Sequence, residues 1–195
     1  KNGNPKWELN HLNGKTSGLQ KNWYEAGQIK KEYGKKNGMY DGIFRELHKN
    51  GQLMEEKKYV EGNLEDTLKA WDREGNLAEL TIFKNDEIQG VSKRWWENGI
   101  IREEITYING KKNGLCKKWS MDGKDSMQVN YKDNKVWEGL EKRWFGGKRP
   151  SSEATYKDGK LHGVSKTFHW SGSKIAKEEF YENGKLIKTK EYDKE

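Results

Sequence analysis

The sequence predicts an all-β protein, built as an elongated single-layer antiparallel sheet or solenoid of about seven β-hairpin repeats of 24 residues each. Turn residues, mostly glycine, recur every 24 residues through most of the chain. A large and usually aromatic residue recurs in step with them, and pairs of segments of five to eight residues alternate with the turns. Self-similarity at such a period indicates a repeat architecture, and short segments between glycine-rich turns favour hairpins.

Two columns of turn residues set the period. The first column comprises Gly14, Gly38, Gly62, Asp86, Gly110, Asn134, Gly159 and Gly184, with 25 residues in each of the last two steps. The second column lies four residues further on, or five in the sixth repeat, and comprises Gly18, Gly42, Asp66, Gly90, Gly114, Gly139 and Gly163. Asp66 is the departure from glycine in the second column. We therefore expect the chain to turn between two strands in every repeat.

An aromatic column lies four residues before a further column of glycines, which gives the motif Trp-x-x-x-Gly. The aromatic column comprises Trp23, Leu47, Trp71, Trp95, Trp119, Trp144 and Phe168. A two-residue turn would place Trp95 opposite Arg102, whereas a three-residue loop with a left-handed glycine would place it opposite Ile101. We prefer the second register because it gathers apolar side chains on one face, and a one-residue slip exchanges the faces. These side chains are Val91, Trp95, Ile101, Ile105 and Tyr107.

The composition predicts a sheet with one aromatic and one polar face rather than a thick globular core. The chain has 195 residues and a net charge of +7, with 31% hydrophobic and 35% charged residues. Such a balance leans towards disorder, but nine Trp, nine Tyr and five Phe are too many for a solvated tail. No apolar run approaches the roughly 18 residues that a membrane-spanning helix needs. The single cysteine, Cys116, excludes an internal disulfide.

We expect residues 7–195 to form a single repeat domain. Its repeats start near residues 11, 35, 59, 83, 107, 131 and 156, and a partial C-terminal repeat starts at 181. The sixth repeat is irregular, because Gly146, Gly147, Lys148 and Pro150 replace the usual turn. Proline cannot donate a hydrogen bond to a strand ladder, so we expect a kink near Pro150 and leave the register of this repeat open.

The repeat resembles the MORN repeat in the variant form common in bacterial proteins. The resemblance rests on the Tyr-x-Asn-Gly-Lys turns at 107–111 and 181–185, the strands at 114–119 and 139–144, and the hairpin motif at 95–99. It covers about residues 7–192. Bacterial proteins built in this way are often catalogued as YwqK-like antitoxins. The family implies binding of a protein or a membrane, and it carries no catalytic residues.

A column of cations runs through all seven repeats, two residues before the aromatic column and on its face. It comprises Lys21, Arg45, Lys69, Lys93, Lys117, Lys142 and Lys166. The column could bind a polyanion or an acidic protein, or it could pair with acidic residues across the hairpin and stabilise the sheet. The acidic partners are Glu55, Glu79 and Glu103 in one register, or Glu32, Glu56 and Glu104 in the other. Lys117 faces Met127 or Gln128, which suggests an unpaired cation.

The candidate binding surface combines the tryptophans with part of the cation column. A long exposed aromatic groove would be an interaction surface, whereas the alternative is that the rings form only the packing face of the sheet. Trp96 follows Trp95 and is expected on the opposite face, where it breaks the polar pattern. The candidate residues are Trp23, Trp71, Trp95, Trp96, Trp119, Trp144, Lys93, Lys117 and Lys142.

The sequence offers no catalytic or metal-binding set, and we expect neither an enzyme nor a cofactor. The four histidines, His11, His48, His162 and His169, fall at different repeat positions and form no pair with the spacing of metal ligands. Cys116 has no His or Asn partner that spacing identifies. The glycines mark turns and form no phosphate loop, so no small-molecule substrate is expected.

We expect a protein partner, with an anionic membrane surface or a cell-wall polymer or glycan as alternatives. Nucleic acid is disfavoured, because an acidic column on the same face would repel phosphates. Since the chain begins with Lys1 rather than Met, we expect a trimmed or processed form. Its compartment would be the bacterial cytoplasm or, if a signal peptide has been removed, the periplasm or cell surface.

The hairpin repeat can be tested by spectroscopy on the purified chain. We expect a far-ultraviolet circular dichroism spectrum of pure β-structure with strong tryptophan fluorescence, because every repeat contributes strands and most contribute a tryptophan. A spectrum with the double minimum of an α-helix would contradict the repeat interpretation.

Overall fold

The computed structural model describes residues 5–145, 149–171 and 174–193. Contacts within the chain divide it into two compact units, Lys1–Gly99 and Ile100–Glu195, here called the N-terminal unit and the C-terminal unit. Every regular element in the described ranges is a β-strand. No helix in these ranges is long and apolar enough to cross a membrane.

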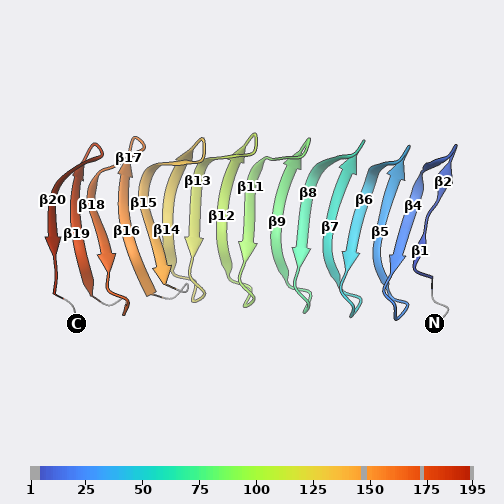
Figure 1. Ribbon diagram of the computed structural model, residues 1–195, viewed down its shortest axis with the longest axis horizontal. Coiled ribbons are helices and arrows are strands. Elements are labelled where there is room, and N and C mark those ends of the chain that lie inside the picture. The colour runs from blue at the N-terminus through green and yellow to red at the C-terminus, as the bar shows by residue number, and fades with distance from the viewer. Residues whose placement is uncertain (1–4, 146–148, 172–173, 194–195) are drawn as a thin grey trace. The chain divides into compact units, whose positions relative to one another are not determined.

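In the N-terminal unit each long strand pairs antiparallel with its neighbours along the chain (Figure 1). The strands of its sheet are β1 (Trp7–Glu8), β4 (Gly18–Trp23), β5 (Ile29–Lys36), β6 (Met39–Leu47), β7 (Leu53–Val60), β8 (Asn63–Trp71), β9 (Leu77–Lys84), β10 (Glu87–Ile88) and β11 (Gly90–Trp95). β1 covers part of the outer edge of β4, and both β10 and β11 pair with β9. A separate hairpin joins β2 (His11–Leu12) to β3 (Lys15–Thr16).

The C-terminal unit repeats this plan. Its strands are β12 (Ile101–Ile108), β13 (Lys111–Trp119), β14 (Asp125–Lys132), β15 (Lys135–Phe145), β16 (Arg149–Lys157), β17 (Lys160–Leu161), β18 (Gly163–Phe168), β19 (Ile175–Glu182) and β20 (Lys185–Glu191). These strands pair antiparallel with their neighbours along the chain, except that β17 and β18 both pair with β16. The prediction of an all-β, antiparallel sheet of hairpin repeats is therefore confirmed within each unit. Residues 146–148 of the irregular sixth repeat lie outside the described ranges, and next to them Trp144 lies opposite Pro150.

The first turn column forms two-residue turns with left-handed backbone. Between β5 and β6, Asn37 has φ of 52° and Gly38 has φ of 89°, which is the geometry of a type I′ turn and explains the recurring Asn-Gly pairs. The N–H group of Gly38 donates a hydrogen bond of 2.8 Å to the carbonyl of Thr16 in the preceding hairpin. Later turns repeat this bond to the hairpin before them, as Gly62 does to Tyr40. These hydrogen bonds thus connect one repeat to the repeat that precedes it.

The second set of loops has the three-residue geometry that we preferred. In the first of these loops the N–H group of Tyr24 donates to the carbonyl of Gln28 at 2.8 Å, and that of Gly27 donates to the carbonyl of Tyr24 at 2.9 Å. Gly27 has φ of 94°, as a glycine bulge requires. The aromatic column then lies opposite the residue six places on, as Trp23 does opposite Ile29.

A β-bulge follows those of these loops whose two strands lie within one unit, and the predicted grouping of apolar side chains on one face took no account of it. Lys118 of β13 lies opposite Met127, but the next residue, Trp119, lies opposite Asp125. The extra residue in β14 shifts the alternation of faces. Ile105 and Tyr107 share a face with Cys116, and Trp119 lies on the other face with Leu115, since alternate residues of a strand point the same way.

The two faces of each sheet differ in burial. One face, here called the tyrosine face, holds the small core of the C-terminal unit, in which Ile105, Cys116, Met127 and Val129 are buried and Tyr107, Tyr131 and Val136 pack against them. In the N-terminal unit the same face carries a cluster of rings around the buried Phe44. The rings are Tyr33, Tyr40, Phe44 and Tyr59, with centroids 5.0 to 6.4 Å apart. The opposite face is here called the cation face.

A buried side chain of strand β4 forms hydrogen bonds with backbone groups next to the strand. Gln20 is fully buried, its Oε1 accepts a hydrogen bond of 3.0 Å from the N–H group of Asn10, and its Nε2 donates to the carbonyls of Asn10 and Gly18 at 3.1 Å. The segment before β4 is therefore held against the first repeat by the side chain of Gln20. A polar residue at this buried position is satisfied by backbone groups that a neighbouring strand would otherwise pair.

The tight spacing of β5 and β6 generates a stability prediction. A Cβ atom on Gly34 would lie 2.0 Å from the carbonyl oxygen of Asp41, whereas one on Gly38 would meet nothing within 4 Å. We expect Gly34→Ala to lower the free energy of unfolding by more than about 2 kcal/mol, because backbone must move. The control Gly38→Asn should cost less than about 1 kcal/mol, since asparagine tolerates left-handed backbone. Urea unfolding followed by fluorescence measures both, and equal costs would contradict the close approach.

Candidate interaction surface

The cation face carries a row of exposed aliphatic side chains. In the N-terminal unit Leu19 is 47% exposed, Ile43 42% and Val91 38%, and all three occupy the same repeat position. Leu115 and Leu140 hold this position in the C-terminal unit at 39% and 36% exposure. Met39, Val60 and Ile82 are exposed on the same face, because each is next in sequence to a residue that points to the tyrosine face. Isolated exposed leucines are ordinary, but their concentration on one face is not.

The cation column lies beside this row and is partly neutralised. Arg45 Nε is 2.7 Å from Glu56 Oε2 and its Nη1 is 3.3 Å from Glu32 Oε1. The hydrogen bonds that Arg45 donates to these carboxylates, that to Glu56 first, raise the pKa of Arg45. In the C-terminal unit Lys142 Nζ is 3.0 Å from Glu153 Oε1. Such pairs at the surface are worth about 0–1 kcal/mol each, so the column contributes modestly to the sheet.

The pairing register selects one of the two acidic columns. Lys21 lies opposite Glu32, Arg45 opposite Glu56, and Lys117 opposite Glu104. The other acidic residues belong to the tyrosine face, where Glu55 pairs with Lys57 at 2.8 Å, Glu79 with Arg94 at 3.2 Å and Glu103 with Lys118 at 3.4 Å.

The pairing register places two polar residues beside Lys117, and whether its ammonium is unpaired stays a prediction. Lys117 lies opposite Gln128 in β14, which is one of the two residues expected, and opposite Glu104 in β12. Lys93 lies opposite Leu80 of β9. Lys69, in the same row, also lies opposite Leu80 and has Glu56 on its other side.

The tryptophans of the candidate surface are half-buried rather than fully exposed. Trp23, Trp71 and Trp95 end strands β4, β8 and β11 of the N-terminal unit, and Trp96 follows β11 directly. Trp119 ends β13 of the C-terminal unit, and Trp144 lies near the end of β15. The structure therefore places the nine candidate residues in two groups, one in each unit: Trp23, Trp71, Trp95, Trp96 and Lys93, and then Trp119, Trp144, Lys117 and Lys142.

The most exposed tryptophans lie outside the aromatic column. Trp7 is 57% exposed and Trp170 is 72% exposed. Lys6 Nζ lies 5.0 Å from the centroid of Trp7, and the guanidinium carbon of Arg149 lies 4.1 Å from that of Trp170. The repeat pattern does not predict that either tryptophan is exposed, because Trp7 precedes the aromatic column and Trp170 lies two residues after its last member, Phe168. Their exposure could not be read from spacing.

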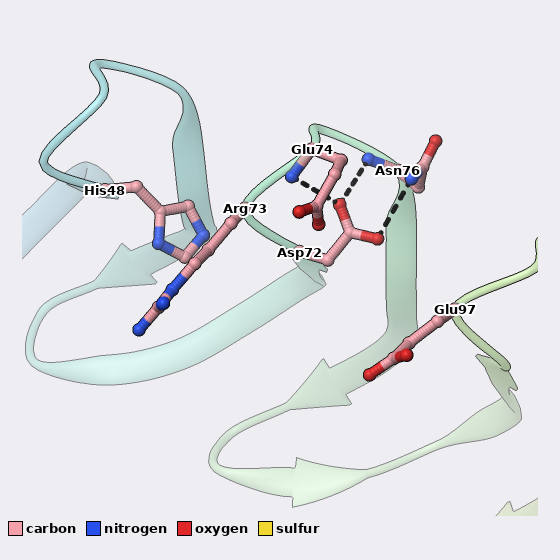
Figure 2. Close-up of a pocket in the computed structure, with 6 residues that line it drawn as sticks. All are labelled: His48, Asp72, Arg73, Glu74, Asn76 and Glu97. Atoms are coloured by element: carbon pink, nitrogen blue, oxygen red, sulfur yellow. Dashed lines mark hydrogen bonds between the residues drawn. The ribbon is translucent and has the colours of Figure 1, made fainter.

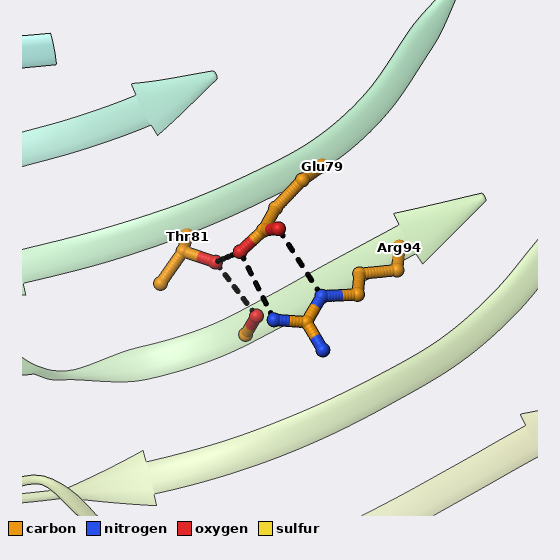
Figure 3. A network of polar contacts seen from close by, with 4 residues as sticks. Glu79, Thr81 and Arg94 are labelled. Carbon is orange, nitrogen blue, oxygen red and sulfur yellow. Dashed lines mark hydrogen bonds and ion pairs between the residues drawn. The ribbon is translucent and has the colours of Figure 1, made fainter. Parts of the chain in front are cut away.

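The tyrosine face of the N-terminal unit changes from aromatic to polar along the sheet. Around Phe44, Lys31 Nζ and Lys57 Nζ lie 5.7 and 5.0 Å from the ring centroid. Two repeats on, the hydroxyl of Thr81 lies 2.8 Å from that of Ser92 and donates to Glu79 Oε1 at 3.0 Å, and Arg94 Nε donates to Glu79 Oε2 at 3.2 Å (Figure 3). Thr81 and Ser92 are buried, and the network satisfies their hydroxyl groups.

The described residues hold no group of three or more His, Cys, Asp and Glu side chains that could bind a metal ion. Cys116 is fully buried, and this burial raises the pKa of its thiol to about 11. Burial also raises the pKa of Tyr131, which packs against the same core, to about 12. Both groups are neutral at physiological pH and act as packing residues.

Comparison with known families supports the repeat class. The family model described as the MORN repeat variant matches residues 17–33, 40–61, 88–109 and 176–194. Four segments of the chain are thus similar to the MORN repeat variant, as the turn and strand motifs indicated. MORN repeats are non-catalytic modules that generally bind proteins or membranes. A search of curated proteins found no significant match.

The burial of Cys116 generates a prediction of reactivity. A rise of the thiol pKa from 9.0 to about 11 lowers the thiolate fraction about 100-fold near neutral pH. We therefore expect the native protein to react with an aromatic disulfide reagent at pH 8 at least about 100 times more slowly than the urea-unfolded chain. Similar rates in the two states would show that the core around Cys116 is open.

Proposed function

We propose that this protein is a non-enzymatic repeat scaffold that binds a protein partner through its cation face, in the manner of an antitoxin. The observation that carries the proposal is the exposed aliphatic row, in which Leu19, Ile43 and Val91 recur at one repeat position in the N-terminal unit. Apolar side chains aligned on one face are characteristic of a surface that is covered by another molecule. Leu115 and Leu140 continue the pattern in the C-terminal unit.

The neighbouring columns give this face the make-up of a protein interface. The aliphatic row supplies area whose burial stabilises a complex by about 25 cal/mol per Å². The half-buried tryptophans, Trp23, Trp71 and Trp95 in the N-terminal unit and Trp119 and Trp144 in the C-terminal unit, lie on the same face beyond the cations. Aromatic residues and a polar rim are typical of binding hot spots. In this arrangement Lys93, Lys117 and Lys142 would set orientation and rate of association more than affinity.

A second candidate function is binding to an anionic membrane surface or a cell-wall polymer. The observation that favours it is the pairing of the two most exposed tryptophans with cations, Trp7 with Lys6 and Trp170 with Arg149. Amphipathic rings beside basic side chains suit a membrane interface, where each basic residue contributes about 1 kcal/mol on an anionic leaflet. The match to MORN repeats accords with either function.

The two functions can be separated by affinity capture from the source cell lysate, with nuclease present, at about 0.15 M and about 0.5 M salt. We expect one protein to be retained at both salt concentrations by the wild-type chain. Ile43→Glu should release it, because a charge would enter the apolar contact. The matched control Leu12→Glu, at a 62% exposed residue of the separate β2–β3 hairpin, should retain it.

The opposite result would support the second function. Capture of only salt-labile material, lost to the same degree in both variants, would contradict the protein scaffold. Sedimentation with vesicles containing anionic lipid, or with wall polymer, would then be the decisive measurement. Replacing Trp7 and Trp170 with alanine should weaken that binding if these rings enter the interface.

A further inference from the structure

Three clefts lie between successive hairpin loops at one end of the strands in the N-terminal unit. The loops span residues 24–28, 48–52 and 72–76, and the fourth loop begins at Trp96. The middle cleft, here called the loop cleft, has a volume of about 530 Å³ and is lined by Tyr24, His48, Lys49, Asn50, Met54 and Arg73. Clefts of about 300–1,000 Å³ hold small ligands or the side chains of a partner.

The loop cleft is the cationic one of the three. Lys49 and Arg73 line it, and no carboxylate does. The cleft on one side includes Glu25 with Lys49. The cleft on the other side shares His48 and Arg73 with the loop cleft but is lined as well by Asp72, Glu74 and Glu97 (Figure 2). Positive charge is therefore concentrated in one cleft rather than spread along the loops.

Neither cation in the loop cleft has an ion-pair partner among the described residues. This contrasts with Arg45 on the same unit, whose guanidinium contacts two carboxylates. Asp72, one of the two acids next to Arg73 in sequence, is engaged by its own loop. Its Oδ1 accepts from the N–H group of Asn76 at 2.8 Å and its Oδ2 from Asn76 Nδ2 at 3.0 Å, as Figure 2 shows. The hydrogen bond from the Asn76 side chain lowers the pKa of Asp72.

Hydrogen bonds between neighbouring loops hold the walls of the loop cleft in place. Asn50 Nδ2 donates to the carbonyl of Arg73 at 2.8 Å, and His48 Nε2 lies 3.3 Å from the carbonyl of Trp71. Tyr24 Oη donates to the carbonyl of Leu47 at 2.7 Å on the other side. A site whose walls are already fixed loses less conformational entropy when it binds a ligand. The two cations are thus presented by a rigid frame.

We propose that the loop cleft binds an oxyanion, a carboxylate or a phosphate, between Lys49 and Arg73. The guanidinium of Arg73 can engage two oxygens of such a group at once, and the ammonium of Lys49 supplies a point charge. Met54 and the ring of Tyr24 offer apolar contact to the remainder of the ligand. The site lies at the loop ends of the strands, so the proposal is independent of the partner bound by the cation face.

The test is a titration of the full chain followed by amide nuclear magnetic resonance shifts at constant ionic strength. Two probes are used: inorganic phosphate and the capped peptide acetyl-Asp-Glu-Asp-amide. We expect saturable shifts confined to residues 24–28, 48–52 and 72–76. Arg73→Gln and Lys49→Gln should each weaken binding at least about fivefold, because each removes a charged hydrogen bond. Saturation by phosphate alone or by the peptide alone identifies the source of the oxyanion.

The matched control is Lys36→Gln, which removes one charge from the same unit at the opposite end of β5. It should change the affinity less than about twofold, because exposed charges far from the site are screened. Arg73→Lys should give an intermediate loss of affinity, and this variant tests whether bidentate binding by the guanidinium contributes. Dispersed amide spectra confirm that each variant is folded. Absence of saturable shifts with both probes, or equal losses in Lys36→Gln and Arg73→Gln, would overturn the proposal and leave the partner-capture result unaffected.

Discussion

A single layer of β-sheet can bury a side chain only beneath its own neighbours, and this constraint shapes both units of the protein. Within each unit the described strands supply no second layer over Phe44 or Cys116, so rings and long cationic side chains from adjacent strands close over them. Tyrosine and lysine serve this purpose because each combines an apolar body with a polar tip. The low aliphatic content and high charge of the chain follow from the need to cover a thin core from within.

The same constraint makes each repeat depend on the one beside it. The N–H group of Gly38 reaches back to Thr16 at one end of the strands, and Asn50 reaches forward to Arg73 at the other. Both ends of a hairpin are thus fixed by hydrogen bonds to a neighbour as well as by the strand ladder. Stability in such an array is approximately a sum of terms between nearest neighbours. At β4, hydrogen bonds between the side chain of Gln20 and the backbone of Asn10 add to these contacts.

A sheet with two solvent-facing sides also has room for more than one function. The tyrosine face is occupied by its own rings and salt bridges, so its apolar groups are covered. The cation face leaves Leu19, Ile43 and Val91 partly in water, and the loop ends gather Lys49 and Arg73 without neutralising them. A broad apolar surface and a small charged cleft recognise different chemistry. Their separation on the sheet allows each to act without the other.

The sequence by itself determined the period, the turns and the loop geometry, because left-handed backbone at positions such as Asn37, Gly38 and Gly27 restricts the residues allowed there. It also identified the cation column and both candidate acidic columns. Only the tertiary structure decided which acids face the cations and which face carries the exposed leucines, since a one-residue bulge in β14, after the loop that follows Trp119, shifts the alternation of faces and leaves no trace in the composition. The loop cleft likewise required three dimensions, because it joins Tyr24, Lys49 and Arg73 from three successive repeats, and spacing alone does not show that these side chains line one cleft.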